Sequence, residues 1–182
     1  MAIQKILCAI LLGPALLLAQ AKDSAPAADS PWSLLKPFAG RWRGVTRGEP
    51  GQGTVQRRYE FILNGKFLRE TNTSTYPPQK KNAKGEVHHH FSVFSYDRQR
   101  KKLVFRQFHQ EGFVNQYVLE SASADGKRLV FVSEAIENIT PGWRARETYT
   151  IAGDSEIAER FELAAPGKEF ELYSENRLHR VK

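Results

Sequence analysis

Two glutamates lie on the more apolar faces of neighbouring strand-like segments, where two carboxyl groups could do chemistry. Residues 143–151 and 156–163 alternate in polarity, and their more apolar alternate positions include Glu147 and Glu159. Such a pair can act as acid and base when the two pKa values are driven apart. Ion pairs with Arg57 or Arg69 explain the carboxylates more simply, so we expect no catalytic residue here.

The same alternation places further polar side chains on inward faces, Gln107 and Asn176 among them. An unsatisfied buried polar group costs about 1–3 kcal/mol, so these groups either satisfy one another or line a wet cavity that receives a ligand. His109 comes one residue before a turn, which places it at a barrel rim. The candidate ligand-binding residues are Arg57, Tyr59, His109, Asn115, Tyr117, Glu147, Tyr149 and Glu159.

Other motifs are better explained without a site. His88 and His90 share one strand face and could chelate a metal, but no third ligand is identifiable, so we expect surface histidines and no metal site. Trp143 is expected in the core at a barrel end. The chain has no Gly-x-Ser-x-Gly elbow and no phosphate-binding glycine loop.

Ten strand-length segments must position these residues. They are rich in β-branched and aromatic residues and are separated by turn signals such as Asn64-Gly65. No segment has the pattern of a crossover helix, so the strands pair antiparallel, and closure into a barrel hides both edges. The expected strands are 41–47, 54–63, 66–76, 87–96, 102–110, 113–121, 128–137, 143–151, 156–163 and 169–181.

We therefore predict an all-β protein with a single ten-stranded antiparallel up-and-down barrel. A short N-terminal helical turn at residues 31–38 should cover one barrel end. The apolar residues expected to point inward include Phe61, Leu63, Phe170, Leu172 and Leu178.

The N-terminus has the pattern of a signal peptide over residues 1–21. Lys5 precedes an apolar run, and Ala19-Gln20-Ala21 forms a cleavage site. Residues 22–30 are expected to be a flexible linker, and residues 31–182 the barrel domain. The one cysteine, Cys8, lies in the leader, so the mature chain would have no disulfide and no thiol nucleophile. We expect a periplasmic or secreted protein.

The formal net charge is +7, but acidic residues are interspersed throughout the chain. Basic residues concentrate only at 79–84 and 98–102, in expected turns, which favours solvated loops over a nucleic-acid site. We expect no nucleic-acid partner and no transmembrane segment after signal cleavage. The sequence leaves the oligomeric state open.

Gly40-Arg41-Trp42 at the start of the first strand, the ten-strand meander and an arginine in the last strand resemble the calycins. The resemblance implies that Arg177 or Arg180 packs over Trp42 and closes the barrel. Within that group the chain is similar to the fatty-acid-binding-protein-like branch that includes nitrobindin, a haem-binding barrel. It is closer still to secreted bacterial barrels of unknown function, through the segments 106–109, 112–117 and 141–144.

The nitrobindin resemblance implies a haem-ligating histidine in the C-terminal strand, and this chain departs from that pattern. The histidine found there is His179, on the face expected to point outward, and the position seven residues before Arg180 is Tyr173. Tyrosine can ligate haem iron in principle. Haem is therefore a weak candidate cofactor, and no other cofactor is indicated.

Three functions fit these observations. The favoured one is a binding protein that holds a small apolar or amphipathic molecule in the barrel. The second is an envelope structural or interaction protein with a filled core, and the third is an enzyme acting on a bound cofactor or lipid-like substrate. A cavity of several hundred cubic ångströms would favour the first and third, and a densely packed interior the second.

Overall fold

In the computed structural model, which describes residues 30–182, the chain forms one short 3-10 turn and ten strands. The expected signal peptide (1–21) and all but the last residue of the expected linker (22–30) lie outside the described residues. Within the described part, no helix is long and apolar enough to cross a membrane. The elements are η1 (Lys36–Phe38), β1 (Gly40–Gly48), β2 (Gly51–Ile62), β3 (Phe67–Tyr76), β4 (Glu86–Asp97), β5 (Lys102–His109), β6 (Val114–Ala122), β7 (Arg128–Glu137), β8 (Arg144–Ala152), β9 (Glu156–Ala164) and β10 (Glu171–Arg180).

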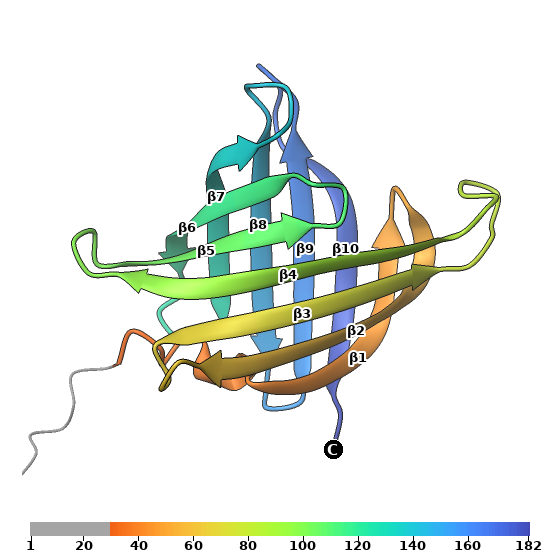
Figure 1. Cartoon of the computed structure of the whole chain (residues 1–182). Coiled ribbons are helices and arrows are strands. Elements are labelled where there is room, and N and C mark those ends of the chain that lie inside the picture. The colour runs from red at the N-terminus through yellow and green to blue at the C-terminus, as the bar shows by residue number, and fades with distance from the viewer. Residues whose placement is uncertain (1–29) are drawn as a thin grey trace, which may run out of the picture.

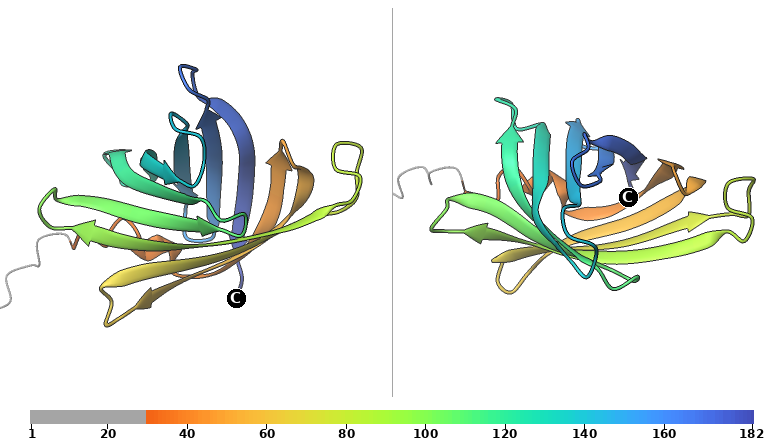
Figure 2. Two further views of the ribbon diagram at one scale, coloured as in Figure 1. Left: turned by 45° about the horizontal axis from the view of Figure 1, so that its top comes forward. Right: turned by 90° about the horizontal axis from the view of Figure 1, so that it is seen from above.

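The ten strands form a closed antiparallel barrel, as predicted. Each strand pairs with the next along the chain, and β1 pairs with β10, so the sheet has no free edge. Figure 1 shows β3 to β5 crossing in front of β8 and β9, with the interior enclosed between the two groups of strands. The two further views in Figure 2 show the same curved wall surrounding the interior.

Side chains alternate between the interior and the outer surface, and the more apolar set points inward. On β8, Ala145, Glu147, Tyr149 and Ile151 are buried, as the sequence pattern predicted. Strands β3 and β4 have apolar residues on both faces in the sequence. In the structure their inward faces begin at Leu68 on β3 and at Glu86 on β4 and include these buried residues: Leu68, Glu70, Asn72, Ser74, Tyr76, Ser92 and Phe94.

The prediction that Leu63 points inward is wrong, because this residue lies in the tight turn between β2 and β3. Leu63, Asn64 and Gly65 all have a left-handed backbone, with φ of 49°, 57° and 73°. Leu63 therefore belongs to the turn and not to the strand, and its side chain is 69% exposed. Asn and Gly adopt this conformation readily, which is why the pair predicted the hairpin correctly.

Two further residues that were predicted to point inward lie outside the barrel because of a β-bulge in β10. The pairing of β10 with β9 shifts between Leu172 and Ser174, so residues before the shift are out of phase with those after it. Leu172 is consequently exposed. Phe170 lies outside the barrel as well, where its ring centroid is 4.8 Å from the guanidinium of Arg144 and 4.3 Å from that of Arg146.

The N-terminal turn covers one end of the barrel, as expected. Phe38 is buried, and its ring meets the edges of Tyr59 and Tyr149 with centroids 5.3 Å apart in each case. The indole Nε1 of Trp42 donates to the Phe38 carbonyl oxygen at 2.7 Å. Figure 1 shows this segment, in orange, at the bottom of the barrel.

Arg180, and not Arg177, closes this end. Its guanidinium lies 4.3 Å from the centroid of the Trp42 ring and donates to the carbonyl oxygens of Pro37 and Ala39, both at 2.6 Å. Arg177 is exposed, because it is an odd number of residues away from inward-facing Leu178 and therefore points outward.

Aromatic side chains fill the half of the interior next to the N-terminal turn. Phe94, Phe105 and Phe131 pack together there, with ring centroids between 4.4 and 6.0 Å apart. The other half of the interior carries most of the polar inward residues, and the candidate site lies there.

Candidate functional site

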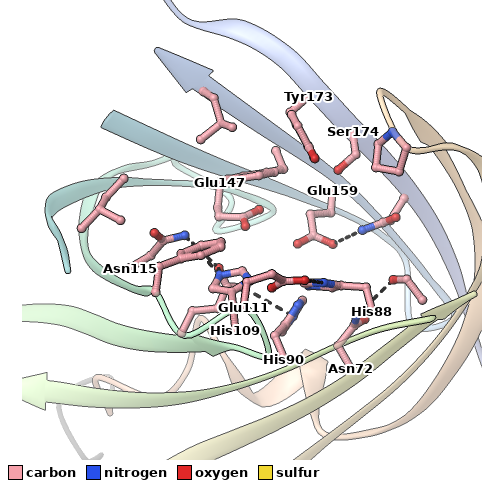
Figure 3. Close-up of a pocket in the computed structure, with 18 of the residues that line it drawn as sticks. Asn72, His88, His90, His109, Glu111, Asn115, Glu147, Glu159, Tyr173 and Ser174 are labelled. Carbon is pink, nitrogen blue, oxygen red and sulfur yellow. Dashed lines mark hydrogen bonds and ion pairs between the residues drawn. The ribbon is translucent and has the colours of Figure 1, made fainter. Parts of the chain in front are cut away.

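A cavity of about 460 Å³ occupies the half of the barrel beyond the aromatic core. Every strand from β2 to β10 contributes at least one lining residue, so closure of the barrel creates the space. Figure 3 shows side chains from facing walls converging on it, with His88, His90 and His109 on one side and Glu147, Glu159 and Tyr173 on the other.

Arg57 organises the floor of this cavity. Its side chain is buried, and its Nε lies 2.9 Å from Glu70 Oε1 and donates to Asn72 Oδ1 at 3.0 Å. Its Nη1 donates to Glu159 Oε2 at 2.6 Å and to the Tyr59 hydroxyl at 3.2 Å. A buried guanidinium with two carboxylate partners is compensated in charge, so Arg57 is a fixed part of the structure.

Glu70 is ionised in this network. Burial by itself would raise the pKa of its carboxyl, but the charge of Arg57 and the hydrogen bond and charge of His90 outweigh burial and lower the pKa to about 2. Its Oε1 is 3.2 Å from His90 Nε2. The carboxylate therefore links the arginine floor to the histidine wall.

Glu147 is in the opposite state. Burial, and then the charge of nearby Glu159, raise the pKa of its carboxyl well above the usual range. Of these two glutamates, Glu159 is the one that pairs with Arg57, and it also accepts a hydrogen bond from Asn176 Nδ2 at 2.8 Å. Glu147 therefore keeps its proton. Its Oε2 and the Tyr149 hydroxyl are buried and have no partner within the part of the chain that the structure describes. A neutral carboxyl group here can donate a hydrogen bond to a bound molecule.

A second polar group surrounds Asn115. Its Nδ2 donates to the Tyr117 hydroxyl at 3.0 Å, while its Oδ1 is buried with no partner in the described segment. His109 Nε2 contacts Gln107 Oε1 at 3.0 Å. Burial, and then the charges of His90 and His88, lower the pKa of His109 to about 3, so this imidazole is neutral at physiological pH.

The two walls of the cavity differ in polarity. The wall built from β3 to β5 carries amides, hydroxyls and imidazoles. The wall built from β7 to β10 and the loops beside them is mainly apolar at the mouth, where it presents Ile136, Ile139, Trp143, Phe161, Leu163 and Tyr173. Trp143 was expected in the core, but it precedes the first residue of β8 and is 38% exposed at the rim. The cavity as a whole is amphipathic.

The structure brings the candidate ligand-binding residues together. Five of the eight line the cavity: Arg57, His109, Asn115, Glu147 and Glu159. The three tyrosines do not line it. Tyr59, Tyr117 and Tyr149 are buried beneath, where Tyr59 and Tyr117 bond to Arg57 and Asn115.

Sequence reasoning missed the contribution of β3 and β4. Asn72, Ser74, His88 and His90 all line the cavity. The expectation of surface histidines is wrong for His90, whose side chain is 9% exposed, and for His88, at 21%. The turn after Asp97 could have predicted their position. A hairpin that pairs Asp97 with Lys102 also pairs His90 with His109, which the sequence pattern placed on the inward face.

The described residues do not fit a haem ligated from the C-terminal strand. His179 on β10 is exposed on the outer surface. Tyr173 lines the cavity, but burial raises the pKa of its phenol, which disfavours the anionic form that would ligate iron. We derive no role for haem.

No family model matches the chain, and no curated protein of similar sequence is found. Among solved structures, the crystal structure of Rv2717c from M. tuberculosis is similar, with a TM-score of 0.65. The match covers 87% of this chain and 99% of that one at 18% sequence identity. The likeness shows the β-barrel fold alone.

Proposed function

We propose that this protein is an exported calycin-like barrel of the fatty-acid-binding-protein and nitrobindin-like branch that binds one small amphipathic molecule. The cavity of about 460 Å³ carries the proposal. Its volume falls within the roughly 300–1,000 Å³ of typical ligand sites, which favours a binding function over a filled core.

The polar groups around the cavity indicate what the ligand offers. Asn115 Oδ1 and Asn176 Oδ1 are buried acceptors without partners among residues 30–182. A ligand with a hydroxyl or N–H group would satisfy them and recover part of the roughly 1–3 kcal/mol that each unsatisfied group costs. Arg57 already pairs with Glu70 and Glu159, so it does not serve as a clamp for a ligand carboxylate.

The apolar wall indicates where the rest of the ligand lies. Ile136, Phe161 and Leu163 face the cavity from β7 and β9, with Trp143 at the rim. Their contacts would bury the hydrocarbon or aromatic part of the molecule, at about 25 cal/mol per Å² removed from water. We therefore expect a neutral polar head on an apolar body.

Native mass spectrometry of the purified protein tests this directly. We expect a species heavier than the polypeptide by one small molecule, which organic extraction releases for identification. We also expect an environment-sensitive apolar dye to bind the emptied protein at one site. Protein that retains no molecule and binds no dye would refute the binding function.

A matched pair of variants on β7 locates the binding. Ile136→Trp puts a larger side chain into the cavity, whereas Ala135→Trp adds the same ring to the exposed face of the same strand. We expect the first to weaken dye binding at least tenfold and the second to leave it unchanged. Equal behaviour of the two variants would place the dye outside the barrel.

Export is tested separately by expressing the full chain and fractionating the cells. We expect a periplasmic or secreted product whose N-terminus lies near Lys22. A full-length product in the cytoplasm would refute export and leave the binding proposal to its own experiments.

A further inference from the structure

We propose that His88, His90 and His109 form a site for one divalent transition-metal ion, of the Zn²⁺ type, on the polar wall of the cavity. His88 and His90 are two residues apart on β4, and His109 on β5 pairs directly with His90. The ring centroids are 5.3 to 5.6 Å apart, and one ring nitrogen of each histidine lies within 4.8 Å of the others. Figure 3 shows the three rings gathered at one side of the cavity.

The hydrogen bonds of the two deeper histidines orient them as ligands. His90 Nε2 donates to Glu70 Oε1 at 3.2 Å, and Arg57 holds that carboxylate in place at 2.9 Å. His109 Nε2 lies 3.0 Å from Gln107 Oε1 and 3.3 Å from Asn115 Nδ2. The oxygens of Glu70 and Gln107 can only accept, so we place the proton of each ring on Nε2, which leaves the lone pair on Nδ1.

Both of these Nδ1 atoms are buried and have no hydrogen-bond partner among the described residues. Buried polar atoms in native proteins are rarely left unpaired, so two neighbouring exceptions in His90 and His109 require an explanation. Metal-ligating histidines characteristically donate their other ring nitrogen to a carboxylate or carbonyl oxygen. The arrangement matches that pattern, with Glu70 and Gln107 as the outer partners.

His88 completes the set from the cavity mouth. Its Nδ1 contacts Glu111 Oε1 at 2.9 Å, which leaves Nε2 available as a ligand. Tetrahedral Zn²⁺ with Zn–N bonds of 2.0–2.1 Å holds its nitrogens about 3.4 Å apart. One nitrogen of each ring lies within 4.8 Å of the others in the described structure, so metal binding requires these separations to close by at most about 1.4 Å.

The surrounding charge favours a cation. Glu86 and Glu111 line the cavity beside His88, and the ionised carboxylate of Glu70 lies 3.2 Å from His90 Nε2. The charge of Glu159 is already paired with Arg57, and Glu147 keeps its proton. Imidazole nitrogens select Zn²⁺, Cu²⁺ or Ni²⁺ over Mg²⁺ and Ca²⁺, which prefer oxygen ligands.

Three protein ligands leave the fourth coordination position of a tetrahedral ion open. Sites that keep an open position bind water or a donor atom of another molecule there. The inference does not rest on the proposed function, because the three imidazoles and their outer partners bind the ion whether or not an organic molecule is present.

The test is Zn²⁺ titration of untagged, chelator-treated protein by calorimetry, with Co²⁺ absorption as a report of coordination geometry. We expect one ion per chain. His109→Ala should lower the affinity by more than about 100-fold, beyond the 10–100-fold that outer partners contribute. His89→Ala is the matched control, because His89 lies between the ligands and is exposed on the outer face.

A second variant keeps the test decisive if His109→Ala does not fold. His88 lies at the mouth of the cavity and is less buried, so His88→Ala should fold, as circular dichroism would check, and should lose the same affinity. Equal loss in His89→Ala, or no binding at micromolar Zn²⁺, would overturn the site. Binding retained by His109→Ala and abolished by Glu111→Gln would place the ion on Glu86, His88 and Glu111 and would overturn it as well.

Discussion

Glu147→Gln should stabilise the protein at neutral pH. The carboxyl is buried, and burial together with the charge of Glu159 raises its pKa well above the usual range. The folded protein therefore keeps a proton that the unfolded chain releases above about pH 4.3. Because the folded state binds more protons in this interval, the free energy of unfolding falls as pH rises, by about 1.4 kcal/mol per pH unit. Glutamine has nearly the same shape and carries no titrating proton, so it removes this slope.

Urea denaturation of both proteins between pH 4 and pH 8 measures the effect. We expect nearly equal stability at pH 4 and a growing advantage for Glu147→Gln as pH rises, until the folded-state carboxyl itself titrates. Glu159→Gln is the contrasting variant, because it removes a partner of Arg57 and should lower the free energy of unfolding at neutral pH. A Glu147→Gln variant that is destabilised at every pH, or whose advantage does not change with pH, would refute the assignment of the proton to Glu147.

Three further predictions concern stability. Arg57→Met leaves two buried carboxylates without their partner and should cost about 3–5 kcal/mol in urea denaturation; a loss under about 1 kcal/mol would contradict the network. The pKa of Glu70 is about 2 in the folded protein, below its value in the unfolded chain. The ionised carboxylate therefore stabilises the fold at pH values above the unfolded-state pKa, and this stabilisation is lost as pH falls toward 2. The loss should be about 3 kcal/mol, and Glu70→Gln should show a correspondingly shallower acid transition. Gly44→Ala would place a Cβ 1.7 Å from the Arg177 carbonyl oxygen and should lower Tm more than Gly65→Ala, whose Cβ meets no atom within 4 Å.

The sequence predicts the inward residues where one strand face is clearly more apolar than the other. Arg57, Glu147 and Glu159 were placed correctly for that reason. Strand β4 has Phe91 and Val93 on one face and Phe94 on the other, so alternation gives no direction for its histidines. Their position follows from pairing with β5, which is a property of two strands together.

The bulge in β10 and the size of the cavity also depend on how strands fit together and not on any one segment of sequence. Nothing in residues 169–181 marks the shift after Leu172, because the extra residue is defined against β9. The space between facing walls is likewise set by how ten strands close and how far each side chain reaches. Strand alternation therefore predicts polar groups in the interior, but neither the volume that they surround nor which of them remain unpaired.

The contact between the two ends of the barrel has a consequence for how the protein is made. Strand β1 can pair with β10 only after β10 has been synthesised, and Arg180 donates to the carbonyl of Ala39, 141 residues earlier. Such long-range closure is slow compared with local structure. During synthesis every shorter chain keeps β1 and its newest strand as open edges that can pair with another copy. Pairing of β10 with β1 is thus the step that removes the two open edges of the sheet.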